Sequence, residues 1–222
     1  MKVDQLIRSN RKSFGLEIKP DGTLIVRAPK FATENQIQAL LQNKASWIKK
    51  TRSRLLHSHP RPKPKTFSPG ETFWYLGEEI PLQLTDRLRP PLALDGVFTL
   101  SSTAQNRARA VFIAWYREET RTITQHLIDS YAKRYPFNVN QVRITSARTR
   151  WGSCSGKNNL NFTYRLSMAP LHVVEYVVVH ELVHLKVRNH SKTFWNAIYT
   201  IKPDYQTDRA WLKKYGAMLT LD

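Results

Sequence analysis

The feature that most constrains the fold is the run VVVHELVHLKVRNHSKTFW, from Val177 to Trp195, where three histidines and one glutamate interrupt an apolar segment. Burying such groups costs free energy unless a partner satisfies them. Apolar residues from Val174 to Leu185 cover most of the circumference of a helix, which predicts a helix at the centre of its domain. Pro170 predicts where this helix starts.

His180, Glu181 and His184 form the pattern H-E-x-x-H. Residues four apart on a helix lie about 40° apart around its axis, so both imidazoles can meet one metal ion. The glutamate can reach a water molecule on that metal, and the three residues together are the parts of a metal hydrolase. Chance gives roughly 0.01 such matches in a chain of this composition, which favours a metal site over histidines bonded to backbone.

A catalytic zinc site needs a third protein ligand. No glutamate follows Glu181, and His190 is the only histidine after His184. Spacing and elimination therefore both select His190. In the longer pattern H-E-x-x-H-x-x-G-x-x-H, Val187 replaces the glycine of the turn, so we expect Asn189 to adopt the left-handed conformation instead. Ser191 is the expected cap of the next helix.

The remaining chain predicts an α+β fold in which antiparallel strands pack on the motif helix and on a long helix. Turn residues Asp21-Gly22 and Gly77 indicate two hairpins, no βαβ alternation is visible, and Thr33 is placed to cap a helix. A long amphipathic helix is predicted from about Thr103 to before Pro136, followed by strands over 141–168. Two closing helices are predicted over 192–201 and 205–215.

Charge divides the chain unevenly. The formal net charge is +18, and residues 1–65 hold 15 Lys and Arg against four acidic residues. This excess predicts attraction to an anionic partner such as nucleic acid or a nucleotide, although a solvated surface explains it equally well. We predict a basic, β-rich N-terminal region with one helix over residues 1–100 and a catalytic domain over residues 101–222.

The location is predicted from what the chain lacks. Its single cysteine, Cys154, excludes an intramolecular disulfide. The N-terminus has no hydrophobic signal core, and no apolar run reaches the roughly 18 residues of a membrane helix. We therefore expect a cytoplasmic protein without a membrane partner.

Three segments resemble the YgjP-like metallopeptidase family, a relative of the SprT and WLM zinc-protease domains: WGSCS from Trp151, the NLNFTYRLSMAP that follows, and the histidine run. The hairpin LEIKPDGTLIVRAP also resembles the family. The resemblance implies a zincin-like domain with Zn²⁺ on His180, His184 and His190, and Glu181 as general base. It further implies a strand beside the motif helix that pairs with an extended substrate, for which residues 159–165 are the candidate.

The expected activity is hydrolysis of peptide bonds by zinc-activated water, with a peptide or protein as substrate. One alternative is a nucleoside triphosphate pyrophosphatase using the same metal site. Another is a nucleic-acid-associated protein in which zinc is structural, although an open metal position argues against it.

Other residues are candidates for minor roles. Asp204 or Asp208 could orient a ligand histidine. Cys154 is expected to be a small buried thiol rather than a nucleophile. The candidates for substrate contact or oxyanion stabilisation are Tyr205, Tyr199, Arg165, Asn161 and Trp151, for which core packing is the competing interpretation.

Overall fold

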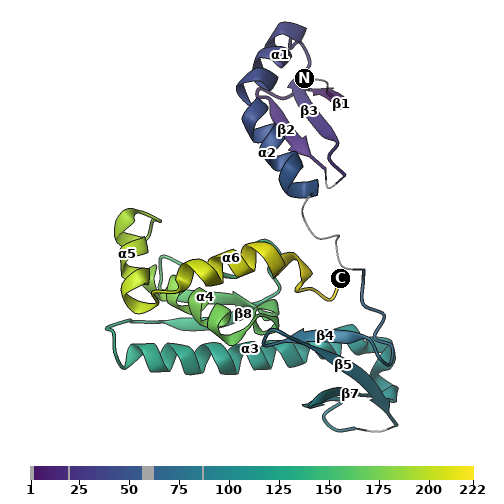
Figure 1. The fold of residues 1–222 in the computed structure, drawn as a ribbon, viewed down its shortest axis with the longest axis vertical. Helices are drawn as coiled ribbons and strands as arrows, with labels where there is room; N and C mark the ends of the chain where they lie inside the picture. Colours follow the sequence, from purple (N-terminus) through teal and green to yellow (C-terminus); the bar gives the residue numbers. More distant parts are fainter. Residues whose placement is uncertain (1–2, 20, 57–62, 87) are drawn as a thin grey trace. The chain divides into compact units, whose positions relative to one another are not determined.

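The computed structural model describes residues 3–19, 21–56, 63–86 and 88–222. It divides the chain into two compact units, Met1–Pro60 and Arg61–Asp222, called here the N-terminal and C-terminal units (Figure 1). Among the described residues, no helix is long and apolar enough to cross a membrane.

The N-terminal unit is a three-stranded sheet with two helices. Strand β3 is central, antiparallel to β2 and parallel to β1. Thr33 caps α1 as predicted, in a capping box with Gln36. Lys44 ends α1, so the single helix expected here is two helices. The elements are β1 (Gln5–Ser9), β2 (Gly15–Ile18), β3 (Leu24–Pro29), α1 (Glu34–Asn43) and α2 (Ala45–Leu56).

The C-terminal unit begins with a four-stranded sheet of order β4-β5-β7-β6. The hairpin predicted at Gly77 joins β4 to β5, and Gly77 has φ 90°, a conformation that glycine adopts without strain. This sheet precedes the long helix α3. The elements are β4 (Thr72–Tyr75), β5 (Glu78–Thr85), β6 (Leu92–Asp95), β7 (Val97–Ser101), a 3₁₀ turn η1 (Ser102–Arg107) and α3 (Ala108–Ala132).

A second sheet, of order β8-β10-β9, packs on α3 and on the motif helix α4. The closing helices α5 and α6 have the predicted bounds, and α6 packs on α4 (Figure 1). The elements are β8 (Gln141–Thr145), β9 (Gly152–Cys154), β10 (Asn159–Thr163), η2 (Tyr164–Met168), α4 (Leu171–Val183), α5 (Lys192–Ile201), α6 (Tyr205–Tyr215) and η3 (Gly216–Met218).

The expectation of purely antiparallel sheets is wrong. Each of the three described sheets contains one parallel pair, namely β1 with β3, β5 with β7 and β8 with β10. Hairpin signals identify only strands that are neighbours in sequence. Here β9 takes an edge position and its hairpin partner β10 inserts between β9 and β8, which makes β10 parallel to β8.

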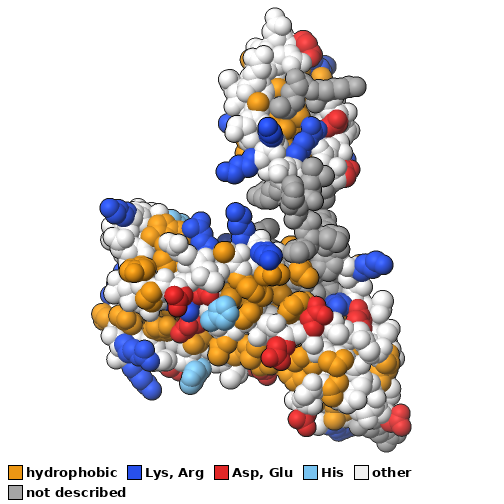
Figure 2. All heavy atoms as spheres, viewed as in Figure 1, with side chains coloured by type: hydrophobic (Ala, Val, Ile, Leu, Met, Phe, Trp, Pro, Cys, Tyr) orange, Lys and Arg blue, Asp and Glu red, His pale blue; other side chains and the backbone are white. Residues whose placement is uncertain are grey.

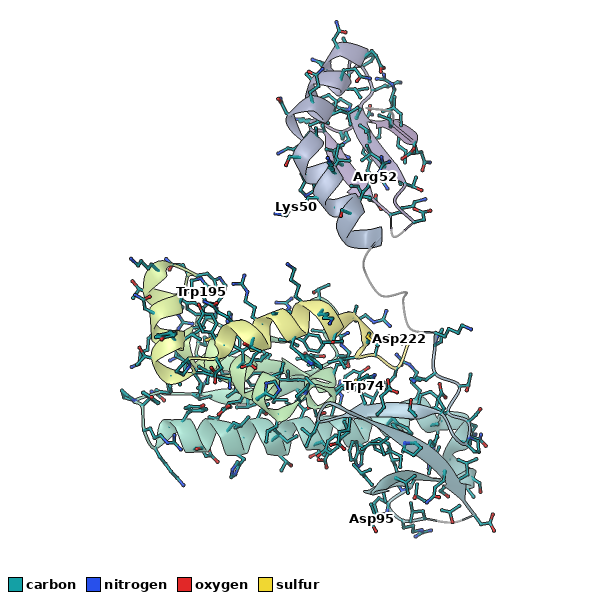
Figure 3. All side chains as sticks on the ribbon, viewed as in Figure 1. Lys50, Arg52, Trp74, Asp95, Trp195 and Asp222 are labelled. Carbon is teal, nitrogen blue, oxygen red and sulfur yellow. The ribbon has the colours of Figure 1, made fainter. Side chains whose placement is uncertain are left out.

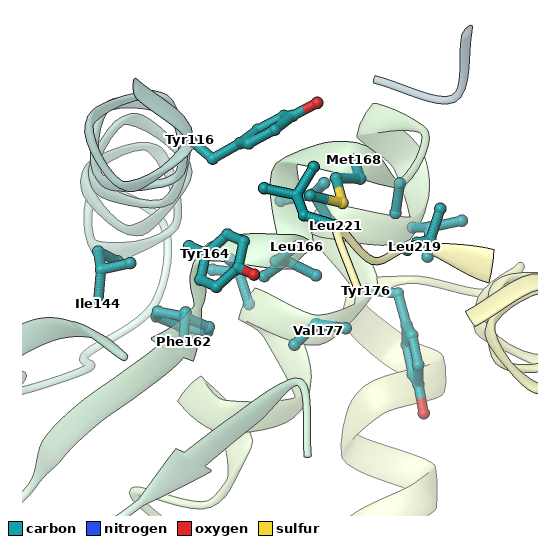
Figure 4. Close-up of a cluster of buried hydrophobic side chains, with 14 of the residues drawn as sticks. Tyr116, Ile144, Phe162, Tyr164, Leu166, Met168, Tyr176, Val177, Leu219 and Leu221 are labelled. Atoms are coloured by element: carbon teal, nitrogen blue, oxygen red, sulfur yellow. The ribbon is translucent and has the colours of Figure 1, made fainter. Parts of the chain in front are cut away.

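One hydrophobic core extends through the whole C-terminal unit. The ring of Phe112 on α3 stacks on Phe73 of β4, with centroids 4.3 Å apart, and also contacts Phe98 of β7. The same cluster continues through Tyr116 and η2 to Val177 of α4 (Figure 4). The structure therefore divides after Pro60, whereas we predicted a boundary after residue 100, because β4–β7 share their core with α3.

Candidate metal centre

The C-terminal end of α4 brings the three histidines together. His180 lies in the last turn of α4, His184 is its C-cap residue, and His190 lies in the segment before α5. The Nε2 atom of His190 is 3.1 Å from that of His180 and 3.2 Å from that of His184. The structure thus brings all three predicted ligands to one point, and a single ion can be held there.

The chain after α4 fixes the orientation of His184. Its Nδ1 is 3.0 Å from the carbonyl oxygen of Val187. A carbonyl only accepts hydrogen bonds, so Nδ1 carries the proton and the Nε2 lone pair is free for a metal. The backbone of the residue that replaces the expected glycine therefore supplies an orienting contact.

The turn between His184 and His190 does not use a left-handed residue. Positive φ among the described non-glycine residues is confined to Phe67, Leu76 and Asn158, so the conformation predicted for Asn189 is wrong. The end of α4 instead tightens, and the amides of Leu185 and Lys186 bond to carbonyls three residues back. Asn189 contributes through its side chain, whose oxygen accepts from the Ser191 amide at 3.3 Å.

Ser191 occupies the N-cap position of α5, as predicted, but its side chain makes no capping hydrogen bond. Helix α5 places aromatic rings against the histidines. The Phe194 ring lies 4.4 to 4.9 Å from all three imidazole centroids. Trp195, which Figure 3 labels, has its ring centroid 5.7 Å from that of His190, on which it stacks.

Arg188 ties this turn to the β9–β10 hairpin. It donates to the Ser155 carbonyl at 2.8 Å, to Asn158 Oδ1 at 2.6 Å and to the Cys154 sulfur at 3.3 Å. The partners lie about 30 residues away in sequence. No local pattern pointed to this role, and sequence reasoning missed it.

Glu181 is buried beside the histidines. It is 5% exposed, and its Oε2 has no hydrogen-bond partner among the described residues. Burial raises the pKa of Glu181 to about 8. A divalent cation nearby would lower it again, because an opposite charge favours the carboxylate. An orphaned acceptor next to three convergent imidazole nitrogens fits a metal centre with a proton-accepting group.

Burial also keeps His180 neutral. Desolvation, with smaller effects of His184 and His190, lowers the pKa of His180 to about 3. Desolvation likewise lowers the pKa of His184. A neutral imidazole is the form that ligates a metal, so the environment favours ligation over protonation.

Gly152 of β9 lies against Glu181. A Cβ built on Gly152 would be 2.7 Å from both Cγ and Oε1 of Glu181, closer than real contacts allow. The glycine therefore admits the carboxylate to its position. The sequence contained this residue within WGSCS, but spacing alone gave no reason to select it.

Two hollows meet at Glu181 and share Gly152 and His180. The first, called here the histidine hollow, has about 300 Å³ and is lined by the three histidines, β9, Arg150 and Arg188. The second, called the aromatic hollow, has about 270 Å³ and is lined by Trp151, Tyr176, Val177, Leu212 and Arg209.

Of the residues predicted to contact the substrate or the oxyanion, only Trp151 lines one of the two hollows at Glu181. Asn161 lies on β10, donates to Ser153 Oγ at 3.2 Å and lines a separate hollow on the sheet. Arg165 stacks over Trp151 at 4.9 Å and donates to three backbone carbonyls. Neither Asn161 nor Arg165 lines the hollows at Glu181.

Tyr205 is 8% exposed and lies between Trp195 and Tyr176, with ring centroids 5.5 and 6.4 Å away. Tyr199 is 60% exposed. Neither tyrosine lines the two hollows, and their assignment to the oxyanion stays a prediction.

The predicted orienting role of Asp208 is wrong. Its Oδ1 is 2.6 Å from Nδ1 of His172, which is not a ligand candidate, and its Oδ2 is 3.3 Å from Lys202. Lys202 also pairs with Glu175 at 2.8 Å. Asp208 thus belongs to a charged network between α4 and α6, away from the three histidines. Asp204 takes the N-cap position of α6 without a side-chain bond.

The predicted substrate strand is also wrong. Residues 159–163 form β10, the middle strand of its sheet, so its backbone groups bond to β8 and β9. Strand β9 is the edge strand next to α4, and it lines the histidine hollow.

A comparison with family profiles decides the assignment, because the profile of the YgjP-like metallopeptidase domain matches residues 12–215. The chain belongs to the YgjP-like family. The match covers most of the N-terminal unit as well as the three histidines. Membership of the YgjP-like family implies a metal ion and a peptide or protein substrate. Comparisons with curated proteins and with solved structures find no match.

Proposed function

We propose that this protein is a zinc peptidase with a zincin-like active site, in which His180, His184 and His190 hold the metal. The convergence of their three Nε2 atoms carries the proposal. Three protein nitrogens and one open position are the donor set of catalytic zinc. No fourth His, Cys, Asp or Glu of the described residues joins the group, which argues against a closed structural site.

Zinc bound there would polarise the scissile carbonyl and lower the pKa of a water molecule. Glu181 is the residue that would accept a proton from the attacking water, because it lines the histidine hollow and is not among the three grouped ligand candidates. The same carboxyl group would then donate that proton to the leaving amine. Gly152 leaves room for the Glu181 carboxylate, which a side chain at position 152 would displace.

We place the extended substrate along β9. An edge strand has unpaired amide and carbonyl groups that can bond to an added chain. The strand runs past the shared wall of the two hollows, so neighbouring side chains of a bound peptide would enter different hollows.

Replacing Glu181 with Gln tests the mechanism. The amide keeps the size of the side chain and cannot accept the proton, so we expect peptide hydrolysis to fall by about 10³-fold or more with the zinc content unchanged. Glu118→Gln, on the exposed side of α3, is the matched control and should leave both quantities unchanged. Full turnover in the Glu181 variant would exclude this mechanism.

A second candidate is hydrolysis of nucleoside triphosphates at the same metal site. The observation that favours it is the presence of Arg150, Arg188 and Arg209 in the two hollows, since arginine binds phosphate well. Incubation of the zinc-loaded protein with nucleoside triphosphates should then release pyrophosphate at a rate that Glu181→Gln abolishes. Location in the cytoplasm stays a prediction.

A further inference from the structure

Three arginines from three separate segments line the hollows on either side of Glu181. Arg150 precedes β9, Arg188 follows α4, and Arg209 lies on α6. Glu181 is the only acidic residue among the described residues that line these hollows. Three arginines thus line a site that is also proposed to bind a metal cation.

None of the three arginines forms an ion pair with a described carboxylate. Elsewhere in the C-terminal unit, cations do find such partners, as Arg109 and Arg148 do with Asp222. Unpaired like charges that line adjoining hollows repel one another, and solvent screens this repulsion in part because all three arginines are exposed. An anionic group entering the hollow would relieve it.

Two of these cations are already held in place. Arg188 is fixed by its three hydrogen bonds to the β9–β10 hairpin. The guanidinium of Arg209 lies 4.8 Å from the centre of the Trp195 ring. A fixed cation loses little conformational entropy on binding, so Arg188 in the histidine hollow is well placed to recognise a carboxylate.

We propose that the active site selects peptides with an acidic side chain next to the scissile bond, bound in the histidine hollow by Arg150 and Arg188. The aromatic hollow, walled by Trp151, Tyr176 and Leu212, takes a large apolar side chain on the other side of that bond. This specificity rests on the proposed peptidase function. A peptide suits the site better than a nucleotide because the two hollows lie along an edge strand, where successive side chains of an extended chain diverge.

The test uses the full zinc-loaded chain and a set of peptides that differ at one position beside an apolar residue. That position is Asp or Glu, the neutral Asn or Gln, or Lys. We expect kcat/KM for the acidic peptides to exceed that for the amides by about 10- to 100-fold, because a charged hydrogen-bonded pair discriminates by that much. The lysine peptides should be the poorest substrates.

Arg150→Glu should abolish or reverse this order, because it replaces a cation of the histidine hollow with an anion. The fold should stay intact, because Arg150 has no hydrogen bond or ion pair with a described residue. Lys157→Glu is the matched control, because it makes the same change of charge at an exposed position of the β9–β10 turn outside both hollows. The control should keep the preference for acidic peptides.

A binding measurement separates the two proposals. Glu181→Gln protein should bind the acidic peptides about 10-fold or more tightly than their amide versions, and increasing salt should reduce that difference. Cleavage with equal kcat/KM for acidic, neutral and basic peptides would overturn the acidic specificity and leave the peptidase function standing. Failure to cleave or bind any peptide, together with release of pyrophosphate from nucleotides, would overturn both.

Discussion

The two units of this protein treat charge differently. In the N-terminal unit, the described ion pairs Arg27–Glu17 and Arg52–Asp4 lie at the surface, and the core around Leu41 and Ile48 is apolar. In the C-terminal unit, Glu181 and Asp208 are 5% and 2% exposed. Lys and Arg side chains nevertheless appear on the surface of both units (Figure 2).

Exposed ion pairs contribute little to stability, whereas burying a charge is costly unless its partners are well placed. Buried charge therefore needs an explanation that surface charge does not. The C-terminal unit provides two such explanations. Glu181 belongs to the proposed reaction centre, and Asp208 belongs to a charged network that links α4 to α6 through Lys202.

This charged network links α4 to α6. Lys202 pairs with Glu175 of α4 and with Asp208 of α6, and Glu175 also accepts from Tyr131 of α3 at 2.7 Å. Burial acts to raise the pKa of Glu175, but the hydrogen bonds from Lys202 and Tyr131 lower the pKa overall. The partners thus outweigh the cost of burial at this carboxylate.

The largest effect is expected at the histidines. His190→Ala removes one of the three proposed ligands, so zinc content should fall. Hydrolysis should drop by more than the roughly 10- to 100-fold that is typical of residues which only orient a ligand. Metal analysis and peptide hydrolysis measure the two quantities. His126→Ala, exposed on α3, should change neither. A His190 variant with full zinc content and activity would remove His190 from the site.

Lys202→Ala tests the contrast between the units directly. It leaves Glu175 and the buried Asp208 without their cation, which should lower the free energy of unfolding of the C-terminal unit by about 3 kcal/mol. Arg27→Ala, which breaks an exposed pair of the N-terminal unit, should cost less than about 1 kcal/mol. Denaturant unfolding measures both. Equal losses would mean that burial does not distinguish the two pairs.

Gly152→Ala should have a smaller effect, confined to activity. The added methyl group would displace the Glu181 carboxylate, so we expect kcat to fall about 10- to 100-fold, which corresponds to about 1.4 to 2.7 kcal/mol. Gly156→Ala is the control, because a Cβ there meets no atom within 4 Å. Zinc content should stay unchanged in both variants. Unchanged kcat in Gly152→Ala would show that Glu181 tolerates displacement.

Local sequence signals predicted much of this structure. Proline and glycine positions gave the helix starting after Pro170 and the hairpins at Gly22 and Gly77, while Thr33 gave a helix cap. The spacing of four between His180 and His184 places both on one face of a helix, so their proximity follows from helix geometry alone.

Contacts between distant segments were beyond those signals. The parallel pairing of β8 with β10 depends on how residues 146–158 return to the sheet, which no hairpin pattern encodes. The roles of Gly152 and Arg188 arise only when β9 packs beside the end of α4. The role predicted for Asp208 is wrong for the same reason, because its contacts with His172 and Lys202 depend on how α6 packs on α4.

The smallest expected effect concerns the nucleic-acid contact predicted for the basic N-terminal region. If residues 1–65 bind phosphates, the affinity of the full chain for duplex DNA should fall steeply as salt increases. The double variant Lys49→Glu/Lys50→Glu should weaken DNA binding and reduce the slope of log affinity against log salt concentration by about 1 per lost contact. Both lysines are exposed on α2 (Figure 3 labels Lys50).

Lys213→Glu/Lys214→Glu on α6 is the control, because it makes the same change of charge in the other unit. Peptide hydrolysis should be unaffected by the first pair, because neither lysine lines the hollows at Glu181. Equal weakening of DNA binding by both pairs would trace it to net charge alone and would remove this difference between the units.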